Sequence, residues 1–367
     1  MSSSEIKSSV GCKLSFEQGP IRPPSEARSL LIRVTRNCPW NKCAFCNTYK
    51  GTQFSIRSVE EIKADIAAIK RIHDEIKALS WSLGLQGEVD DEVIDRVYRS
   101  PHAHSSSYLN VAMWLYFGEG SVFLQDGNNL AATTQELAEV LTYLKETVPG
   151  ISRVTTYARS KTIARRKTAS ELHVLREAGL TRIHVGLESG SDEVLALLRK
   201  GVTAAEHIEA GRRVKEAGIS LSEYVIPGAG GGKFSEEHAR ETAKVLNHIN
   251  PDYIRLRTLR VIPGAGLDEK VASGEFEPLG DEAVVREIRL MIEGLNGIDS
   301  MVISDHILNL LEEVEGKLPE EKSRLLAVID RFLALTPEER CNFRLGRRAN
   351  VYRTLEDMED QARYASV

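Results

Sequence analysis

Apolar and polar residues follow two repeating patterns along most of the chain. Short apolar runs predict buried strands, and these runs lie at residues 29–34, 121–124, 152–157, 182–187, 219–226 and 253–259. Between them, apolar residues recur at helical spacing, which predicts helices at residues 59–79, 133–147, 169–178, 204–217 and 235–249. Strict alternation of this kind implies parallel strands joined by right-handed crossovers.

The alternation gives six β–α units and predicts an α/β fold. Six units fit either an open doubly wound sheet or a full or partial barrel. In each of these architectures the chemistry lies at the carboxyl ends of the strands. Gly179 and Gly218 directly follow two of the predicted helices, at positions typical of a helix end.

Two regions depart from the alternation. Residues 80–120 are too long for an ordinary connection and are interpreted as an insertion, which contains Trp81, His102, His104 and Trp114. Residues 267–367 are predicted to be mainly helical, with helices near 282–295, 304–315 and 320–335. The predicted division is a leader at 1–27, the alternating domain at 28–266 with its insertion at 80–120, and a C-terminal helical cap at 267–367.

Composition and charge narrow the class of protein. Hydrophobic residues make up 42% and charged residues 28% of the chain, which is typical of a globular protein in water. The net charge of -5 gives no electrostatic reason to expect nucleic acid or an anionic membrane as a partner. The first 19 residues lack the apolar core of a signal peptide, and no apolar run approaches the roughly 20 residues of a membrane span. We therefore expect a cytoplasmic protein.

Three of the five cysteines lie within nine residues of one another, at Cys38, Cys43 and Cys46. Such clustering in a cysteine-poor chain indicates a metal site rather than a disulfide scaffold. A structural zinc site takes four protein ligands, whereas a [4Fe–4S] cluster held by three cysteines leaves one iron free. The alternatives are a zinc site completed by Cys12, Cys341 or a histidine, and three unrelated thiols.

The cysteine segment, Cys38-Pro-Trp-Asn-Lys-Cys43-Ala-Phe45-Cys46, resembles the cluster loop of the radical S-adenosylmethionine superfamily. The resemblance covers about residues 29–267. Within the superfamily, the sequence is similar to the group of the anaerobic coproporphyrinogen oxidases and elongator-type proteins. Family members usually have three residues between the first two cysteines, and this chain has four. The resemblance implies a partial (βα)6 TIM-like barrel, and it places Phe45 near the adenine of the cofactor.

Further motifs follow in the family's order. The turn Gln125-Asp126-Gly127-Asn128 resembles the glycine turn whose backbone binds the amino group of the methionine moiety, although it also fits an ordinary strand-to-helix turn. After the fourth strand, the resemblance makes Glu188 and Ser189 candidates to contact the ribose. Alone, Glu188 fits a helix cap equally well. Pro227 belongs to a turn that resembles the one beside the adenine.

Positive side chains are needed for the carboxylate of the cofactor. Arg159 follows the third strand, and Arg255 and Arg257 alternate along the sixth strand, so the last two share one face. If that face points into the barrel, two buried arginines require anionic partners. If it points outward, both are solvated.

The resemblance implies a [4Fe–4S] cluster and S-adenosylmethionine as cofactors. Reductive cleavage of S-adenosylmethionine would give a 5′-deoxyadenosyl radical that takes hydrogen from a small-molecule substrate. The expected electron donor is a reductant such as flavodoxin or ferredoxin, in an anaerobic cytoplasm. The insertion at 80–120 is a candidate substrate lid with Trp81 and Trp114 as contacts, unless these tryptophans only pack the insertion onto the barrel.

The small number of further cysteines and the short segment before Cys38 narrow the choice among subclasses of the superfamily. Fewer than forty residues precede Cys38, and only two further cysteines are present, so we expect neither a cobalamin domain nor an auxiliary four-cysteine cluster. The hypothesis is a single-cluster enzyme that breaks or rearranges a bond of an anionic metabolite, held by Arg255 and Arg257, or of a modified base. The alternatives are a haem-chaperone-like carrier that uses His102, His104 or His306, a queuine-lyase-like salvage enzyme, and a zinc-binding structural protein.

Overall fold

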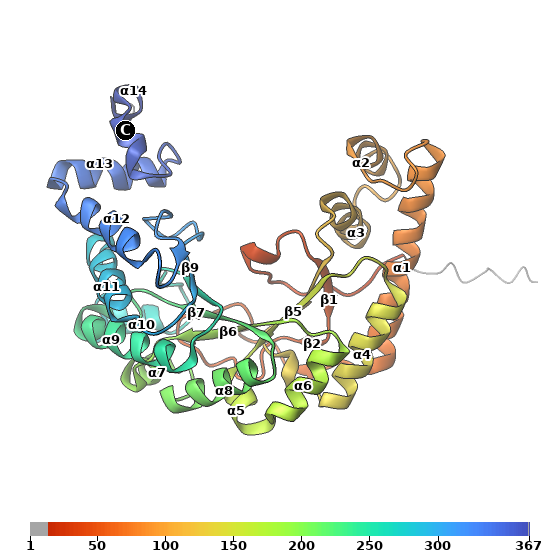
Figure 1. Cartoon of the computed structure of the whole chain (residues 1–367), viewed down its shortest axis with the longest axis horizontal. Coiled ribbons are helices and arrows are strands. Elements are labelled where there is room, and N and C mark those ends of the chain that lie inside the picture. The colour runs from red at the N-terminus through yellow and green to blue at the C-terminus, as the bar shows by residue number, and fades with distance from the viewer. Residues whose placement is uncertain (1–13, 366) are drawn as a thin grey trace, which may run out of the picture.

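The apolar runs form one sheet of eight strands in the order β1–β4–β5–β6–β7–β8–β9–β10. The computed structural model describes residues 14–365 and residue 367. The strands are β1 (Leu30–Arg33), β4 (Ser121–Gln125), β5 (Arg153–Ala158), β6 (Arg182–Glu188), β7 (Ser220–Val225), β8 (Tyr253–Leu256), β9 (Met301–Ile303) and β10 (Gly316–Lys317). Neighbours from β1 to β9 are parallel, and β10 is antiparallel to β9. The result is an α/β fold with a curved, partial TIM-barrel-like sheet (Figure 1).

Helices cover the outer face of this sheet (Figure 1). The main ones are α1 (Val59–Ser82), α4 (Thr134–Thr147), α6 (Ala169–Ala178), α8 (Ala204–Glu216), α9 (Gly231–Ile249) and α11 (Asp281–Gly294). Four of them begin at a capping box, in which a Ser or Thr accepts from the backbone three residues on and a Glu reaches back; the caps are Ser58, Thr133, Thr168 and Thr203. These reciprocal bonds explain why the helix starts were predictable from sequence.

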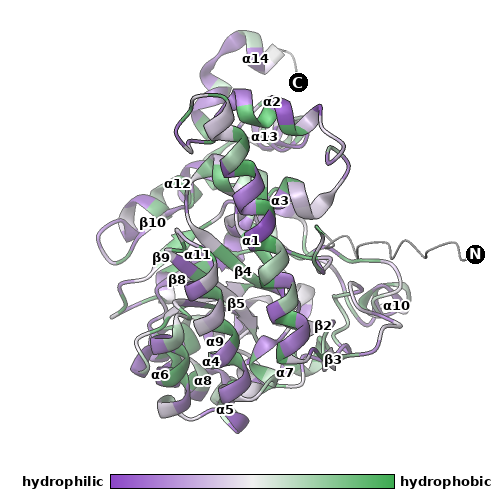
Figure 2. Cartoon of the chain, turned by 90° about the vertical axis from the view of Figure 1, so that its right-hand side faces the viewer, coloured by the Kyte–Doolittle hydropathy of each residue, from purple (hydrophilic) through white to green (hydrophobic). Residues whose placement is uncertain are grey.

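Each outer helix carries one apolar side. Figure 2 shows both hydrophilic and hydrophobic colours along α1, and its buried side is a row of isoleucines: Ile62, Ile66, Ile69, Ile72 and Ile76. These residues belong to the main core between sheet and helices. The described chain contains no helix with the length and apolar character that crossing a membrane would require.

The sheet extends further than predicted. Beyond residue 266, α11 leads into β9, a seventh parallel strand that pairs with β8. The helix predicted at 304–315 is wrong, because this segment forms turns after β9. Its apolar residues fit helical spacing, but the Asn309 side chain donates to the carbonyl of Leu256 and accepts from the backbone of Thr258. These bonds hold the segment against the end of β8.

The rest of the C-terminal region is helical, as predicted. It contains α12 (Lys322–Ala334), α13 (Pro337–Arg348), the 3-10 helix η3 (Leu355–Glu359) and α14 (Gln361–Ala365). Figure 1 shows these elements at one rim of the open barrel.

The predicted insertion stands at the opposite rim (Figure 1). It contains α2 (Asp91–Tyr98) and α3 (Ser106–Phe117), which pack against α1. Trp114 is buried in the main core, and Trp81 is 62% exposed on the surface. Neither tryptophan lines the cavity described below, and the role of the insertion as a substrate lid stays a prediction. The packing alternative holds for Trp114.

The described part of the predicted leader lies in the opening of the barrel (Figure 1). It includes the 3-10 helix η1 (Pro24–Glu26). Glu26 is fully buried, accepts from Arg153 at 3.0 Å and lies 3.4 Å from His184 in β6. This buried ion pair fixes the segment to the inner face of the sheet.

Candidate active site

The three clustered cysteines open onto one cavity at the carboxyl ends of the strands. They lie in a loop between two short paired strands, β2 (Thr35–Arg36) and β3 (Ser55–Ile56), directly after β1. The cavity has an empty volume of about 1310 Å³, including the solvent at its mouth, which is large enough for a cofactor and a small substrate together. Of the two other cysteines, Cys341 is exposed on α13, and Cys12 is outside the described residues.

Backbone contacts hold the cysteine loop against three other segments. The Ala44 N–H donates to the Leu198 carbonyl at 2.8 Å, and the Leu267 N–H donates to the Ala44 carbonyl at 2.9 Å. A Cβ placed on Gly127, in the turn after β4, would lie 3.1 Å from the Cys38 Cβ and 3.4 Å from its sulfur. Only glycine leaves this space beside the thiol.

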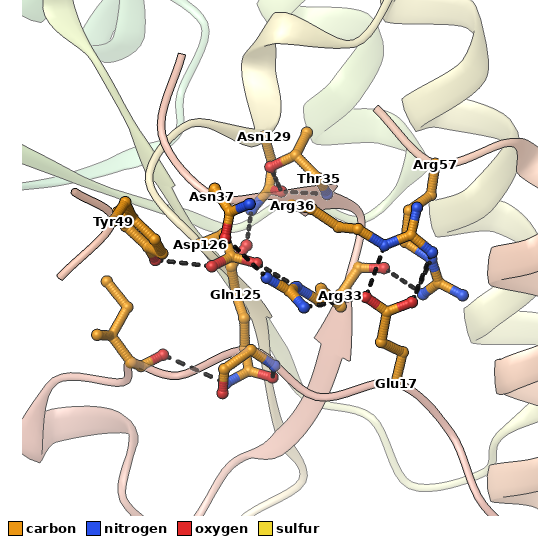
Figure 3. Close-up of polar contacts among 12 residues, drawn as sticks. Glu17, Arg33, Thr35, Arg36, Asn37, Tyr49, Arg57, Gln125, Asp126 and Asn129 are labelled. Carbon is orange, nitrogen blue, oxygen red and sulfur yellow. Dashed lines mark hydrogen bonds and ion pairs between the residues drawn. The ribbon is translucent and has the colours of Figure 1, made fainter. Parts of the chain in front are cut away.

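A charged network ties the loop to the barrel (Figure 3). Asp126 is fully buried, with a positive φ of 73°. It accepts from Arg33 at 2.5 Å and from the Tyr49 hydroxyl, on the cysteine loop, at 2.7 Å. Glu17 accepts from Arg33 and Arg36. The network therefore sets the position of the loop that carries the thiols.

Within the turn predicted to bind the cofactor, only Gly127 lines the cavity. The Gln125 amide bonds to the backbone of Gly19 in the N-terminal segment. Asn128 donates to Thr162 and accepts from the Arg159 N–H. The side chains of Gln125, Asp126 and Asn128 thus support the turn and are absent from the cavity lining, and the predicted binding of the cofactor by the backbone of this turn stays a prediction.

Glu188, the last residue of β6, places a carboxylate in the cavity wall. Glu188 has a φ of 63° and follows a register shift in the pairing with β7, a strained conformation of the kind found at functional sites. Its carboxylate pairs with Lys200 at 2.7 Å. Ser189, predicted to contact the ribose, is fully buried outside the cavity and bonds to His238 of α9 at 2.8 Å.

Two cations lie close to the thiols. Arg159 stacks over the Trp40 ring, 5.0 Å from its centroid, and donates to the Lys200 carbonyl at 2.8 Å. Burial lowers the pKa of Arg159. Burial raises the pKa of the Cys43 thiol, and the positive charges of Lys200 and Arg159 oppose that rise. This end of the cavity can therefore hold an anionic group beside the thiols.

Arg255 and Arg257 both point towards the inside of the barrel, but only Arg257 lines the cavity. Arg255 is 7% exposed and pairs with Asp305 at 3.3 Å. Arg257 lines the cavity, with its guanidinium 4.6 Å from the centroid of the Tyr224 ring. Pro227 lies outside the cavity lining; the next residue in its turn, Gly228, donates to Glu287 at 2.6 Å.

Several cavity residues were missed by sequence reasoning: Tyr49, Tyr157, Lys200, Tyr224, Thr258 and Arg260. Lys200 follows α7 (Asp192–Leu197), a short helix that was not predicted. Of the histidines considered as haem ligands, His306 lines the cavity and His102 and His104 do not; His102 stacks on Tyr108. Within residues 14–365, no group of three His, Cys, Asp or Glu side chains is placed to hold a single metal ion.

Three thiols line one cavity after the first strand of a partial α/β barrel, an arrangement that is compatible with a bound iron–sulfur cluster. Residues 109–246, which begin after the cysteine loop, match the family model of the Radical SAM superfamily. This match covers less than half of the chain, which over these residues is similar to a superfamily whose cofactors are a [4Fe–4S] cluster and S-adenosylmethionine.

The chain is similar to parts of longer proteins. It is 27% identical over 119 residues to the tRNA uridine(34) acetyltransferase of Methanocaldococcus infernus, covering 32% of this chain and 22% of that relative. It is 30% identical over 142 residues to the tRNA-2-methylthio-N(6)-dimethylallyladenosine synthase of Hahella chejuensis, covering 37% and 31%. Among solved structures, methylornithine synthase aligns with a TM-score of 0.45 at 15% identity, covering 82% of this chain and 68% of that chain. The matches thus span less than a third of both curated relatives.

The residues present fit these cofactors. Three thiols share one cavity wall, the side-chain-free face of Gly127 leaves room beside Cys38, and cations stand next to the thiols. Thiolates are the usual ligands of iron–sulfur clusters.

Proposed function

We propose that this protein is a single-cluster radical SAM enzyme of the cytoplasm that acts on a small molecule, either an anionic metabolite or a modified base. The observation that carries the proposal is the shared cavity of Cys38, Cys43 and Cys46 with free space beyond them. When bound, the cluster and S-adenosylmethionine supply a 5′-deoxyadenosyl radical that abstracts hydrogen from the substrate and leads to bond cleavage or rearrangement. A small electron carrier such as flavodoxin or ferredoxin provides the electron.

The side chains of this protein bind and orient the cofactors and shield the reacting groups from water. Cys38, Cys43 and Cys46 would hold the cluster through their thiolates. Arg159 and Lys200 would bind the carboxylate of S-adenosylmethionine, and Glu188, which Lys200 orients at 2.7 Å, would accept a hydrogen bond from its ribose. Phe45 and Ile226, both on the cavity wall, exclude water from the reacting groups, as such chemistry requires.

Anaerobic reconstitution tests the proposal. The wild-type protein is loaded with iron and sulfide, reduced with dithionite and given S-adenosylmethionine, and 5′-deoxyadenosine is measured by mass spectrometry. Single Cys→Ala substitutions at positions 38, 43 and 46 are expected to abolish cluster binding and product. Cys341→Ala, which removes an exposed thiol far from the loop, is the matched control and should keep both.

A non-catalytic carrier is the second candidate, because His306 lines the same cavity and offers an axial ligand for haem. The same assay separates the two. A carrier binds haem through His306 and forms no 5′-deoxyadenosine even when its cluster is reduced and S-adenosylmethionine is bound.

A further inference from the structure

Two groups of cations act on the cavity wall. The charges of Lys200 and Arg159 act on Cys43. The charge of Arg257 acts on Tyr157, Tyr224 and His306. Arg257 directly follows β8 and His306 follows β9, whereas the cysteine loop follows β1, at the other edge of the sheet.

Arg257 carries a positive charge that no carboxylate in the described chain neutralises. Its guanidinium carbon lies over the face of the Tyr224 ring, 4.6 Å from the ring centroid. Its backbone N–H donates to the Val225 carbonyl. Stacking fixes the plane of a guanidinium and leaves its N–H edge free to donate. A guanidinium fixed in this way on a cavity wall can bind a carboxylate or phosphate with its free N–H edge.

The nearby acids are already committed. Asp305, next to His306, pairs with Arg255 at 3.3 Å, and Arg255 itself packs over the Tyr253 ring. Glu188 pairs with Lys200 at 2.7 Å. Arg257 therefore faces the cavity with its charge available to a ligand.

His306 adds a neutral donor beside this cation. Its Nδ1 accepts from the Leu308 N–H at 3.3 Å, which leaves the proton of a neutral imidazole on Nε2. Burial and the neighbouring Arg257 lower the pKa of His306, so the ring is neutral at neutral pH. Arg260 lies on the same stretch of the lining, and its side chain is exposed towards the mouth.

We infer that Arg257, assisted by Arg260 and His306, binds a carboxylate or phosphate group of the substrate in the part of the cavity that the residues after β8 and β9 line. The inference rests on the proposed function, because it assigns the remaining cavity to the substrate. The anionic group anchors one end of the substrate, and the reacting carbon then lies towards Cys38, Cys43 and Cys46. Arg255, which pairs with Asp305 at 3.3 Å and does not line the cavity, acts only as a positioning residue.

The test uses the full chain, reconstituted and saturated with S-adenosylmethionine, with malonate and inorganic phosphate as the two probes. Phenylglyoxal labelling of arginines is followed by peptide mass spectrometry. The effective probe should slow labelling of Arg257 several-fold and leave Arg212 unchanged; Arg212 is exposed on α8. Comparison of malonate with phosphate assigns the chemical class.

Calorimetric titration with the same probes gives the second readout. Arg257→Met should weaken binding of the effective probe by about tenfold or more, because a charge-assisted contact is lost, and Arg212→Met should not. Absence of protection by both probes in wild type, or unchanged affinity in Arg257→Met, overturns the inference.

The outcome is separable from that of the proposed function. Anion binding at Arg257 without any 5′-deoxyadenosine supports the anion site and contradicts the enzyme. Cysteine-dependent 5′-deoxyadenosine without anion protection supports the enzyme and contradicts the anion site.

Discussion

Two neighbouring residues at the end of β6 have opposite surroundings. Glu188 faces the cavity and pairs with Lys200, whereas Ser189 is buried against His238. We expect Glu188→Ala to weaken S-adenosylmethionine binding about tenfold or more. Ser189→Ala should keep that affinity and lower the free energy of unfolding by about 1 kcal/mol, the typical loss for one hydrogen bond. Anaerobic equilibrium dialysis and thermal unfolding measure the two effects, and the reverse pattern would return Ser189 to the cavity.

Glu287 makes stability depend on pH. Burial raises its pKa from 4.5 to about 7, while bonds from Ser235 and Gly228 oppose the rise. Because the folded-state pKa is the higher one, the stabilisation by the neutral carboxyl is complete below pH 4.5 and is lost as the pH rises through about 7. The shift corresponds to about 3 kcal/mol.

Glu287→Gln should remove this dependence. Denaturant unfolding of wild type and variant at about pH 5 and about pH 8 measures it, and we expect the variant to gain relative to wild type at the higher pH. A difference in free energy of unfolding that stays constant between the two pH values would contradict the assignment.

The residue types that sequence reasoning identified were those with local signatures. Three cysteines within nine residues form a pattern that is visible in the sequence alone. Arg159 was found because it lies just after a predicted strand. Lys200 and His306 reach the same cavity from loops remote in sequence. No local pattern marks them, because only the curvature of the whole sheet brings the segments after β6 and β9 to the same cavity as the cysteine loop.

At the scale of elements, the cysteine loop depends on Asp126. This carboxylate joins Arg33 of β1 to Tyr49 of the loop. Asp126→Asn keeps the shape and tolerates the positive φ, but it removes the negative charge that pairs with Arg33. We expect a loss of about 3 kcal/mol in the free energy of unfolding and less iron per chain after reconstitution, with all three thiols present.

The control for this change is Asp95→Asn, an exposed carboxylate on α2 that pairs with Arg99. Iron content and denaturant unfolding are measured on both variants. Full iron content and wild-type stability in Asp126→Asn would show that the network does not position the loop.

The insertion has a structural role at the edge of the sheet. β1 is an edge strand, and Asn110 of α3 accepts from the Leu31 N–H at 3.0 Å and donates to the Ser29 carbonyl. Asn110→Leu should lower the free energy of unfolding by about 1–3 kcal/mol and expose an edge that promotes aggregation. Tyr116→Phe, which removes an exposed bond from α3 to Asp91, should have little effect in the same unfolding and light-scattering measurements.

Elements were predictable where periodicity and caps agree. The helices that begin at Thr133, Thr168 and Thr203 have both signals. β9 was missed because it has three residues, and the apolar spacing after it imitates a helix. The side chain of Asn309 holds the segment after β9 in a non-helical conformation through hydrogen bonds to residues distant in sequence. No local sequence pattern reveals these bonds.

At the scale of the molecule, the barrel is open between β1 and β10, its two edge strands. The N-terminal segment lies against the inner face of the sheet: Glu26 is anchored by Arg153 of β5, and Ile21 lines the cavity. Thiols occupy one end of the resulting cavity and Arg257 lines another part of it. The arrangement suits a protein that holds a reactive group and a small substrate together away from water.

The formation of 5′-deoxyadenosine by the reconstituted, dithionite-reduced protein tests this account most directly. We predict that wild type and Cys341→Ala release 5′-deoxyadenosine and methionine in equal amounts, and that the variants lacking Cys38, Cys43 or Cys46 release neither. Wild-type protein with a reducible cluster and bound S-adenosylmethionine that forms no more product than the cysteine variants would contradict it.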